Sequence, residues 1–538
     1  MESNPNSDDK PRGKATRVEI FDTTLRDGAQ SEHIAYSLTD KLELARELDE
    51  LGVDYIEGGW PGSNPKDMDF FDQACKKKWQ YARITAFGST RHIKNAPSAD
   101  PNLRALIASR APVLIIFGKS WDFHVANALR VSLEDNLAMI ESSVKYLRKH
   151  CVEMLYDAEH FFDGYKHNPC YAMKTLHAAA DAGAKTLTLC DTNGGTLCDE
   201  VKEIVTTVVK EFPNLRIGIH PHNDAAVAVS NALAAVQAGA RHVQGTINGF
   251  GERCGNVDLV AVIANLQIKL GYDCLRGRDS LAKLTEVSRH VYEIGNLALR
   301  DNQPFVGRSA FAHKGGIHVS AVARATATYE HIPPEIVGNT RRILISELSG
   351  RSNIIARAGH KFNLKDRPDD LKKVLNRVME LEHQGYVFEA ADASFELLVR
   401  KTLNMHKPFF NLLGFRMQID VNEKGENVTE ATVKIKVGEQ IEHTAAEGNG
   451  PVNALDSALR KALEKFYHEL KEVSLIDYKV RVVNPKDATR AVVLVTIVSS
   501  DHKNQWTTVG ASQNIIQASY LALVDSVEYK LYQTHDDA

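Results

Sequence analysis

The sequence predicts an α/β fold on two observations. From Arg17 onward, short β-rich apolar runs alternate with amphipathic helical stretches, an order that is typical of a parallel sheet. Eight such units follow one another in about 250 residues, which is the usual extent of a closed (β/α)8 barrel, the TIM barrel. The count of eight favours this barrel over the structural alternative, an open doubly wound sheet.

The predicted strands are the apolar runs themselves. They cover residues 17–21, 53–57, 82–87, 112–117, 151–156, 184–189, 215–219 and 241–247. Between them, stretches such as LTDKLELARELDELG and NPCYAMKTLHAAADAG repeat apolar residues at i, i+3, i+4 and i+7. Both stretches end in glycine, as helices commonly do at their C-terminal caps.

Two further parts are predicted beyond the barrel. The chain is mostly helical and charged over 281–385, which indicates linker subdomains around a loop-like DNQPFVGRSAFAHKGG. The last part reads strand, strand, helix twice, and this internal duplication favours a ligand-sensing α+β regulatory module over a generic α+β domain. The predicted division is a disordered tail 1–16, a catalytic barrel 17–280, linker subdomains 281–385 and an amino-acid-binding domain 386–538.

Composition narrows the class of function. The 538 residues are 43% hydrophobic and 25% charged with a net charge of −4, as in ordinary globular proteins. Without a basic field, we expect no nucleic-acid partner, and no apolar run reaches the roughly 18 residues of a membrane helix. The polar start shows no signal peptide, and the seven cysteines form no C-x-x-C pair. These observations predict a cytoplasmic protein with reduced thiols.

Ionisable residues gather after the predicted strands. They follow the first, fifth, sixth, seventh and eighth strands, in FDTTLRDGAQ, DAEHFFDG, CDTNGG, HPHND and NGFGERCGN. The carboxyl ends of the strands form the active-site face of a TIM barrel. We expect no comparable cluster at the opposite ends of these strands, so the chemistry is predicted at this mouth.

The pair His220 and His222 is the sharpest signal for a metal. Residues i and i+2 of an extended chain point to the same side, and Pro221 keeps the chain extended. Alone, the two histidines could equally form local hydrogen bonds. In a closed barrel, however, the first strand lies near the seventh, so Asp27 can join them. Two imidazoles and one carboxylate leave coordination positions open and suit Zn, Mn, Mg or Fe(II).

Three other side chains at the mouth are candidates for substrate binding or catalysis. Arg26 could stabilise an enolate oxygen or a carboxylate, or simply form a salt bridge. Glu159 is followed by Phe161 and Phe162, which would raise its pKa and suit a general base, or it is an exposed loop residue. Thr192 could donate its hydroxyl to a substrate carboxylate, or cap a helix.

These motifs together resemble a known family, the 2-isopropylmalate, homocitrate and citramalate synthases. FDTTLRDGAQ, HPHND, GERCGN and the duplicated C-terminal module carry the resemblance over nearly the whole chain after the tail. YIEGGWPGSNPKD and VGASQNIIQASYLALVDSVEYKL are most similar to the branch that uses pyruvate. The resemblance implies a metal-dependent Claisen condensation of acetyl-CoA with a 2-oxo acid, giving (R)-citramalate and CoA for isoleucine biosynthesis in that branch.

The resemblance also implies roles for individual residues. Its metal ligands would be Asp27, His220, His222 and Asn256, the last on or near the ion. Arg26 and Thr192 would contact substrate, Glu159 would serve the base step, and His313 in AFAHKGG would be a catalytic histidine. Arg341 in VGNTRR stands where the isopropylmalate branch has a tyrosine, which leaves that role open. The C-terminal module would bind a feedback amino acid, isoleucine or leucine, in a homodimer.

The choice of 2-oxo acid is less determined. Phe87 and Phe117 end the third and fourth predicted strands; they would shrink the pocket in favour of pyruvate if they face it, or else belong to the barrel core. A missing isopropyl group changes the difference in transition-state binding free energy between two substrates by only about 1–3 kcal/mol. The alternatives are 2-isopropylmalate or homocitrate synthase, a lyase or carboxyltransferase relative, and a non-catalytic amino-acid sensor. The duplicated module argues against the lyases, and the intact metal set argues against the sensor.

Overall fold

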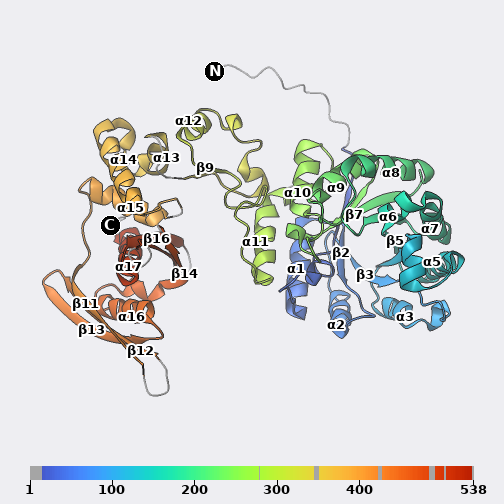
Figure 1. The fold of residues 1–538 in the computed structure, drawn as a ribbon, viewed down its shortest axis with the longest axis horizontal. Helices are drawn as coiled ribbons and strands as arrows, with labels where there is room; N and C mark the ends of the chain where they lie inside the picture. Colours follow the sequence, from blue (N-terminus) through green and yellow to red (C-terminus); the bar gives the residue numbers. More distant parts are fainter. Residues whose placement is uncertain are drawn as a thin grey trace. The chain divides into compact units, whose positions relative to one another are not determined.

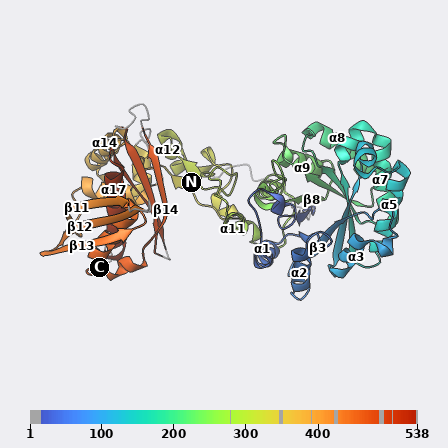
Figure 2. The same ribbon diagram turned by 60° about the horizontal axis from the view of Figure 1, so that its bottom comes forward.

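The computed structural model describes residues 15–277, 279–344, 351–389, 391–421, 427–483, 491–501 and 504–535. The described chain divides into two units (Figures 1 and 2). The first runs to Phe311 and includes Pro334–Thr340, and the second comprises Ala312–Pro333 and continues from Arg341. The tail predicted for residues 1–16 lies, as far as residue 14, outside the described residues.

The first unit is built around a closed barrel of eight parallel strands in the order of the sequence (Figure 2). The strands are β1 (Glu19–Asp22), β2 (Tyr55–Gly59), β3 (Arg83–Ser89), β4 (Val113–Lys119), β5 (Glu153–Glu159), β6 (Thr186–Asp191), β7 (Arg216–Pro221) and β8 (His242–Gly245). The last strand pairs with the first, so that Ile20 lies opposite Val243. The predicted (β/α)8 barrel and its eight strands are therefore confirmed, and the open sheet is excluded.

Helices surround the strands. They are α1 (Leu38–Leu51), α2 (Pro65–Ala74), α3 (Pro101–Ala108), α4 (Asp122–His124), α5 (Leu133–Leu147), α6 (Phe161–His167), α7 (Pro169–Ala182), α8 (Cys198–Glu211), α9 (Ala228–Gln237), α10 (Leu259–Ala264) and α11 (Leu284–Ile294). In α1, Ser37 Oγ accepts the backbone N–H of Asp40 in a capping box. The helix ends at Gly52, whose φ of 88° is the left-handed conformation that glycine adopts most readily.

The amino ends of the strands hold an ionic cluster, so the expectation that these ends have no cluster comparable to the one at the mouth was wrong. Arg216 Nη1 lies 2.9 Å from Glu153 Oε1 and 3.0 Å from Glu19 Oε2. Arg83 contacts the same Glu153 carboxylate, and Tyr55 Oη donates to Glu19. The five residues come from five different strands and appear in the sequence as isolated polar positions. Only barrel closure brings them together.

We expect Glu153→Gln to lower the free energy of unfolding by roughly 2–3 kcal/mol, somewhat below the cost of breaking a fully buried pair. The change leaves two guanidinium groups without their shared carboxylate, which is 8% exposed. Asp72→Asn breaks the exposed Arg110–Asp72 pair and is the matched control, with an expected loss below about 1 kcal/mol. Urea unfolding measures both, and equal losses would show that the cluster does not stabilise the barrel.

The second unit begins with short paired strands and helices. These are β9 (Ala312–His313), β10 (Arg342–Ile343), α12 (Gly316–Arg324), α13 (Arg351–Phe362), α14 (Pro368–His383) and α15 (Asp392–Thr402). Two antiparallel sheets follow, each covered by one helix. They are β11 (Asn411–Val421), β12 (Asn427–Val437) and β13 (Gln440–Gly448) with α16 (Pro451–Leu463), then β14 (Ser474–Val482), β15 (Val493–Ser500) and β16 (Gln505–Ser512) with α17 (Ile515–His535).

The predicted duplication is confirmed, but each half has one strand more than expected. The missed strands β11 and β14 are mostly exposed and each contains a register shift, so their sequences lack a regular alternation. Gly448 and Gly510 occupy equivalent places. A Cβ there would lie 2.4 Å from Ala454 N and 2.1 Å from Ala518 O, so each glycine allows the helix to pack closely on its sheet.

The described residues were also expected to have reduced cysteines and no membrane helix. All seven cysteines carry free thiols. None of the helices in the described part of the chain combines the length and the apolar character that a membrane crossing requires.

Candidate active site

A cavity of about 200 Å³ lies at the carboxyl ends of the barrel strands. Six of the residues selected from the sequence line it: Arg26, Asp27, Glu159, Thr192, His220 and His222. They come from β1, β5, β6 and β7 or from the loops that directly follow these strands. The barrel therefore brings them to one place, as the strand order requires.

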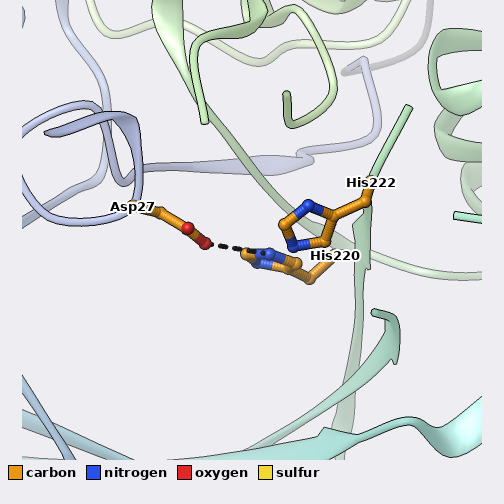
Figure 3. A group of neighbouring side chains, drawn as sticks. All are labelled: Asp27, His220 and His222. Atoms are coloured by element: carbon orange, nitrogen blue, oxygen red, sulfur yellow. Dashed lines mark ion pairs between the residues drawn. The ribbon is translucent and has the colours of Figure 1, made fainter. Parts of the chain in front are cut away.

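Asp27, His220 and His222 form one buried group (Figure 3). One ligand atom from each side chain lies within 4.8 Å of those of the other two. Asp27 Oδ2 is 3.3 Å from His220 Nε2, and Figure 3 shows the carboxylate pointing at the His220 ring with the His222 ring beside it. The three residues are only 4–6% exposed.

The charges in this group are set by burial and by Arg26. Burial opposes ionisation of Asp27, but Arg26 Nη1, 3.2 Å away, and the two histidines hold its pKa far below the usual range. Burial lowers the pKa of His222 to about 4, so this ring is neutral at pH 7. Burial also disfavours the charged form of His220, yet the Asp27 carboxylate outweighs this and raises its pKa.

Two unpartnered atoms indicate that the group fits a cation. His222 Nδ1 and Asn256 Oδ1 are buried without a hydrogen-bond partner among the described residues. A backbone bridge between His222 and Asn256 places the amide beside the group. An unsatisfied buried polar atom costs about 1–3 kcal/mol, which a bound cation removes. Imidazole nitrogens with carboxylate and amide oxygens are a donor set for divalent ions.

Arg26 is held by a residue that sequence analysis did not select. Its Nε lies 2.6 Å from Glu57 Oε2, and its guanidinium carbon lies 3.8 Å from the centre of the Phe87 ring. Glu57 is wholly buried in β2. The salt bridge considered from the sequence therefore exists, and it fixes the orientation of a cation that also lines the cavity.

Glu159 lies at the cavity, but its surroundings differ from those expected. Phe161 and Phe162 are fully buried in α6. Glu159 instead pairs with Lys119, the residue opposite it in the β4–β5 register. The expectation of an apolar environment was therefore wrong, because the Glu159 carboxylate lies against the Lys119 ammonium.

Thr192 is not a helix cap, because α8 begins only at Cys198 with Leu197 as its N-cap. The Thr192 Oγ1 accepts the backbone N–H of His160 at 2.9 Å, which leaves its own proton for another acceptor. His160 has a φ of 56°, an unusual conformation for a residue other than glycine. This strained turn directly follows Glu159 and joins the loops after β5 and β6.

Aromatic rings form one wall of the cavity. Trp60 packs edge-on against Phe87 and Phe117, at centroid distances of 5.5 and 5.7 Å, and the two phenylalanines stack at 5.4 Å. All three rings line the cavity. Both interpretations of Phe87 and Phe117 are therefore observed, because the two rings line the cavity and also pack on the apolar core inside the barrel. Trp60 is a further wall residue that the sequence did not reveal.

The remaining candidate, His313, belongs to the second unit. Its Nε2 lies 3.0 Å from Glu330 Oε1, and Arg341 Nε donates to the same oxygen at 2.5 Å. His313 and Glu330 are each 8% exposed. Glu330 was missed, and it orients both the histidine and the arginine whose role the sequence left open.

The polar residues missed in the barrel share one property. Glu57 and Gln244 lie inside β2 and β8 and Lys119 ends β4, so all three belong to strands and not to the polar loop motifs that predicted the site. Each was visible as a charged or amide residue within an apolar run, in VDYIEGG, LIIFGK and HVQG. Gln244 contacts His220, since its Oε1 lies 2.8 Å from His220 Nδ1.

Comparison with known proteins adds a family assignment to this geometry. Three family profiles match in succession: HMGL-like over residues 17–291, homocitrate synthase post-HMGL domain-like over 305–386, and the LeuA allosteric (dimerisation) domain over 389–531. The (R)-citramalate synthase of Geobacter sulfurreducens is 55% identical, with 96% of this chain and 98% of that protein covered. The one from Aquifex aeolicus is 51% identical, with 97% and 99% covered. A 2-isopropylmalate synthase of Methanocaldococcus jannaschii is 30% identical, with 95% and 94% covered.

Proposed function

The chain belongs to the (R)-citramalate synthase family, and on that premise we propose that it condenses acetyl-CoA with pyruvate to give (R)-citramalate and CoA. The protein is then an acyltransferase that converts the acyl group to an alkyl group on transfer, on a route to isoleucine. The observation that carries the proposal is the buried group of Asp27, His220 and His222 at the barrel mouth, beside Arg26.

Asp27, His220 and His222 would hold a divalent ion, with the Asn256 amide oxygen close by. Such an ion, when bound, polarises the carbonyl of a 2-oxo acid. Two imidazoles and one carboxylate accept Zn, Mn or Mg. Metal analysis of the purified protein by mass spectrometry would identify the native ion.

The other residues at the cavity supply the steps of the condensation. Thr192 donates a hydrogen bond from its hydroxyl group to the pyruvate carboxylate. Glu159 removes a proton from the methyl group of acetyl-CoA, and the carbanion attacks C2 of pyruvate. Arg26, held by Glu57, offsets the negative charge that develops on the oxygen at C2, and a proton from water converts this oxygen to the hydroxyl group of the product. Water then hydrolyses the thioester and releases CoA.

His313 is the proposed catalytic histidine of the second unit. Glu330 and Arg341 support this role, because they fix the orientation of the ring. A His313→Ala variant should lose turnover while its metal content is retained, and full turnover would remove His313 from the mechanism.

Pyruvate is the proposed 2-oxo acid. The wall of Trp60, Phe87 and Phe117 narrows the cavity, which supports a substrate with a small side chain. The test is CoA release with acetyl-CoA and a panel of 2-oxo acids, with and without a chelator. Pyruvate should have a kcat/KM at least about tenfold above that of 2-oxoisovalerate, and chelation should abolish activity. Preference for 2-oxoisovalerate or 2-oxoglutarate would favour the 2-isopropylmalate or homocitrate reaction, and no CoA release would favour a sensor.

Widening the aromatic wall should relax this preference. We expect Phe117→Ala to raise the ratio of kcat/KM for 2-oxoisovalerate over pyruvate by about tenfold, the effect of a few methylene groups in an apolar pocket. Phe123→Ala is the control, since Phe123 is 53% exposed outside the cavity. An unchanged ratio in Phe117→Ala would place the specificity of the enzyme elsewhere.

The second unit is proposed to form a homodimer and to bind a feedback amino acid, isoleucine or leucine. The match of residues 389–531 to an allosteric dimerisation domain supports this. So do the edge strands β11 and β14, which carry exposed apolar side chains such as Ile419 and Ile476. Sedimentation equilibrium tests the dimer, and titration of CoA release with each amino acid tests the effector.

We also propose that the chain divides into a catalytic barrel at 17–280, linker subdomains at 281–385 and a regulatory domain at 386–538. The protein is further proposed to be cytoplasmic, and the free thiols of all seven cysteines support this location.

A further inference from the structure

Gln244 in β8 joins His220 to the interior of the barrel. Its Oε1 lies 2.8 Å from His220 Nδ1, and its Nε2 lies 3.0 Å from Asp157 Oδ1 and 3.1 Å from Thr188 Oγ1. The same Nε2 also lies 3.5 Å from His242 Nε2. Gln244 is 1% exposed, and these four partners are also buried. None of Gln244, Asp157 and Thr188 takes part in the chemistry described above.

The partners of Gln244 determine which way its amide points. Burial raises the pKa of Asp157 to about 6, so it is still mainly an acceptor-only carboxylate at pH 7. The Thr188 hydroxyl can accept from an N–H group as well as donate, so it is compatible with the amide nitrogen at 3.1 Å. The Asp157 carboxylate therefore requires the amide nitrogen, and the amide oxygen must face His220.

An amide oxygen facing Nδ1 fixes the tautomer of His220. Because this oxygen can only accept, Nδ1 must carry a hydrogen. In the neutral ring, Nε2 then has its lone pair, and Nε2 is the atom that lies 3.3 Å from Asp27 Oδ2. The opposite tautomer would point an N–H at the same place and repel a cation.

We infer that Gln244 is a positioning residue, which holds His220 in the tautomer that can bind a divalent cation and is itself held by Asp157 and Thr188. This inference rests on the metal site of the proposed function. Partners of this kind, one contact away from a metal ligand, typically change metal affinity by about 10–100-fold when they are lost.

The test measures the Mn²⁺ dissociation constant of the full chain by competition with a fluorescent chelator. Gln244→Met removes the acceptor at similar size and should weaken binding by about 10–100-fold. It should also shift the visible absorption of the Co²⁺-substituted protein. Gln303→Met is the matched control, because Gln303 is also 1% exposed but bonds to Asn248 and Asp258. The control should bind Mn²⁺ as the wild type does, and an equal loss in the control would overturn the inference.

A second variant tests the chain of contacts. Thr188→Val should weaken Mn²⁺ binding by about three- to tenfold, the usual effect of one lost hydrogen bond. It should add nothing in the Gln244→Met background, because Thr188 acts only through Gln244. A further loss there would contradict this order of action. If Gln244→Met fails to fold by circular dichroism, Thr188→Val decides alone, and wild-type affinity in it overturns the inference.

His220→Ala separates this inference from the metal site itself. Wild-type Mn²⁺ affinity in His220→Ala would remove the proposed site and the inference with it. Loss of affinity in His220→Ala together with wild-type affinity in Gln244→Met would leave the site in place and overturn only the role of Gln244.

Discussion

Glu159→Gln should lower kcat for CoA release by about 10²- to 10⁴-fold, the usual contribution of a positioned general base. Glu159 ends β5 and lines the cavity, and 23% of its side chain is exposed beside Lys119. Glutamine has the same size but cannot take a proton from the methyl group of acetyl-CoA. The chemical step therefore loses its base while the cavity keeps its shape.

The measurement has to separate the base from the metal site. Mn²⁺ binding by Glu159→Gln should stay close to that of the wild type, because Glu159 is not among the clustered ligand atoms. Glu203→Gln makes the same chemical change on the outside of α8, and its kcat should stay within about twofold of wild type, as for most surface substitutions. Wild-type turnover in Glu159→Gln would assign the proton transfer to another group.

The barrel could be predicted because its signals are local. Each strand is a short apolar run, and the helices carry their own period, two of them with a glycine cap at Gly52 and Gly183. The failures of prediction lie where the period breaks or where the strands must close. A register shift near Leu412 hides β11. The cluster around Glu153 depends on residues from five strands that only the closed barrel places together.

The candidate site shows the same difference between local sequence signals, which could be read, and contacts between strands, which could not. Motifs in the loops predict the groups that face the cavity, because the residues of a motif such as HPHND are adjacent in the sequence and therefore stay close together in any fold. The residues behind them could not be assigned, because their contacts cross between strands. Lys119 meets Glu159 only through the register of β4 with β5. This pairing reverses the expected environment of Glu159, from an apolar one inferred from its sequence neighbours to a cationic one.

His220→Ala should remove the bound divalent ion and turnover together. Even the loss of a residue that only contacts a ligand weakens metal binding by about 10–100-fold, so the loss of a ligand should cost at least 100-fold. Asp27 and His222 would remain, but two ligand atoms cannot replace the geometry of three. Metal content after dialysis against buffer, read by mass spectrometry, should fall from one ion per chain to a trace, and CoA release should fall with it.

His290→Ala is the control that tests whether the loss of the ion is specific to the barrel mouth. Glu43, Glu47 and His290, on α1 and α11, are a second group whose ligand atoms lie within 4.8 Å of one another. That group is partly exposed, and His290 Nδ1 pairs with Glu47 at 2.6 Å, so an ion pair accounts for it. The group at the mouth differs in its burial, since its three residues are only 4–6% exposed, and the Asn256 amide lies beside it. His290→Ala should therefore retain the ion and full activity. If His220→Ala retained the ion and His290→Ala lost it, the metal would lie on the outside of the barrel. The condensation would then have no ion at the mouth to polarise the carbonyl group of the 2-oxo acid.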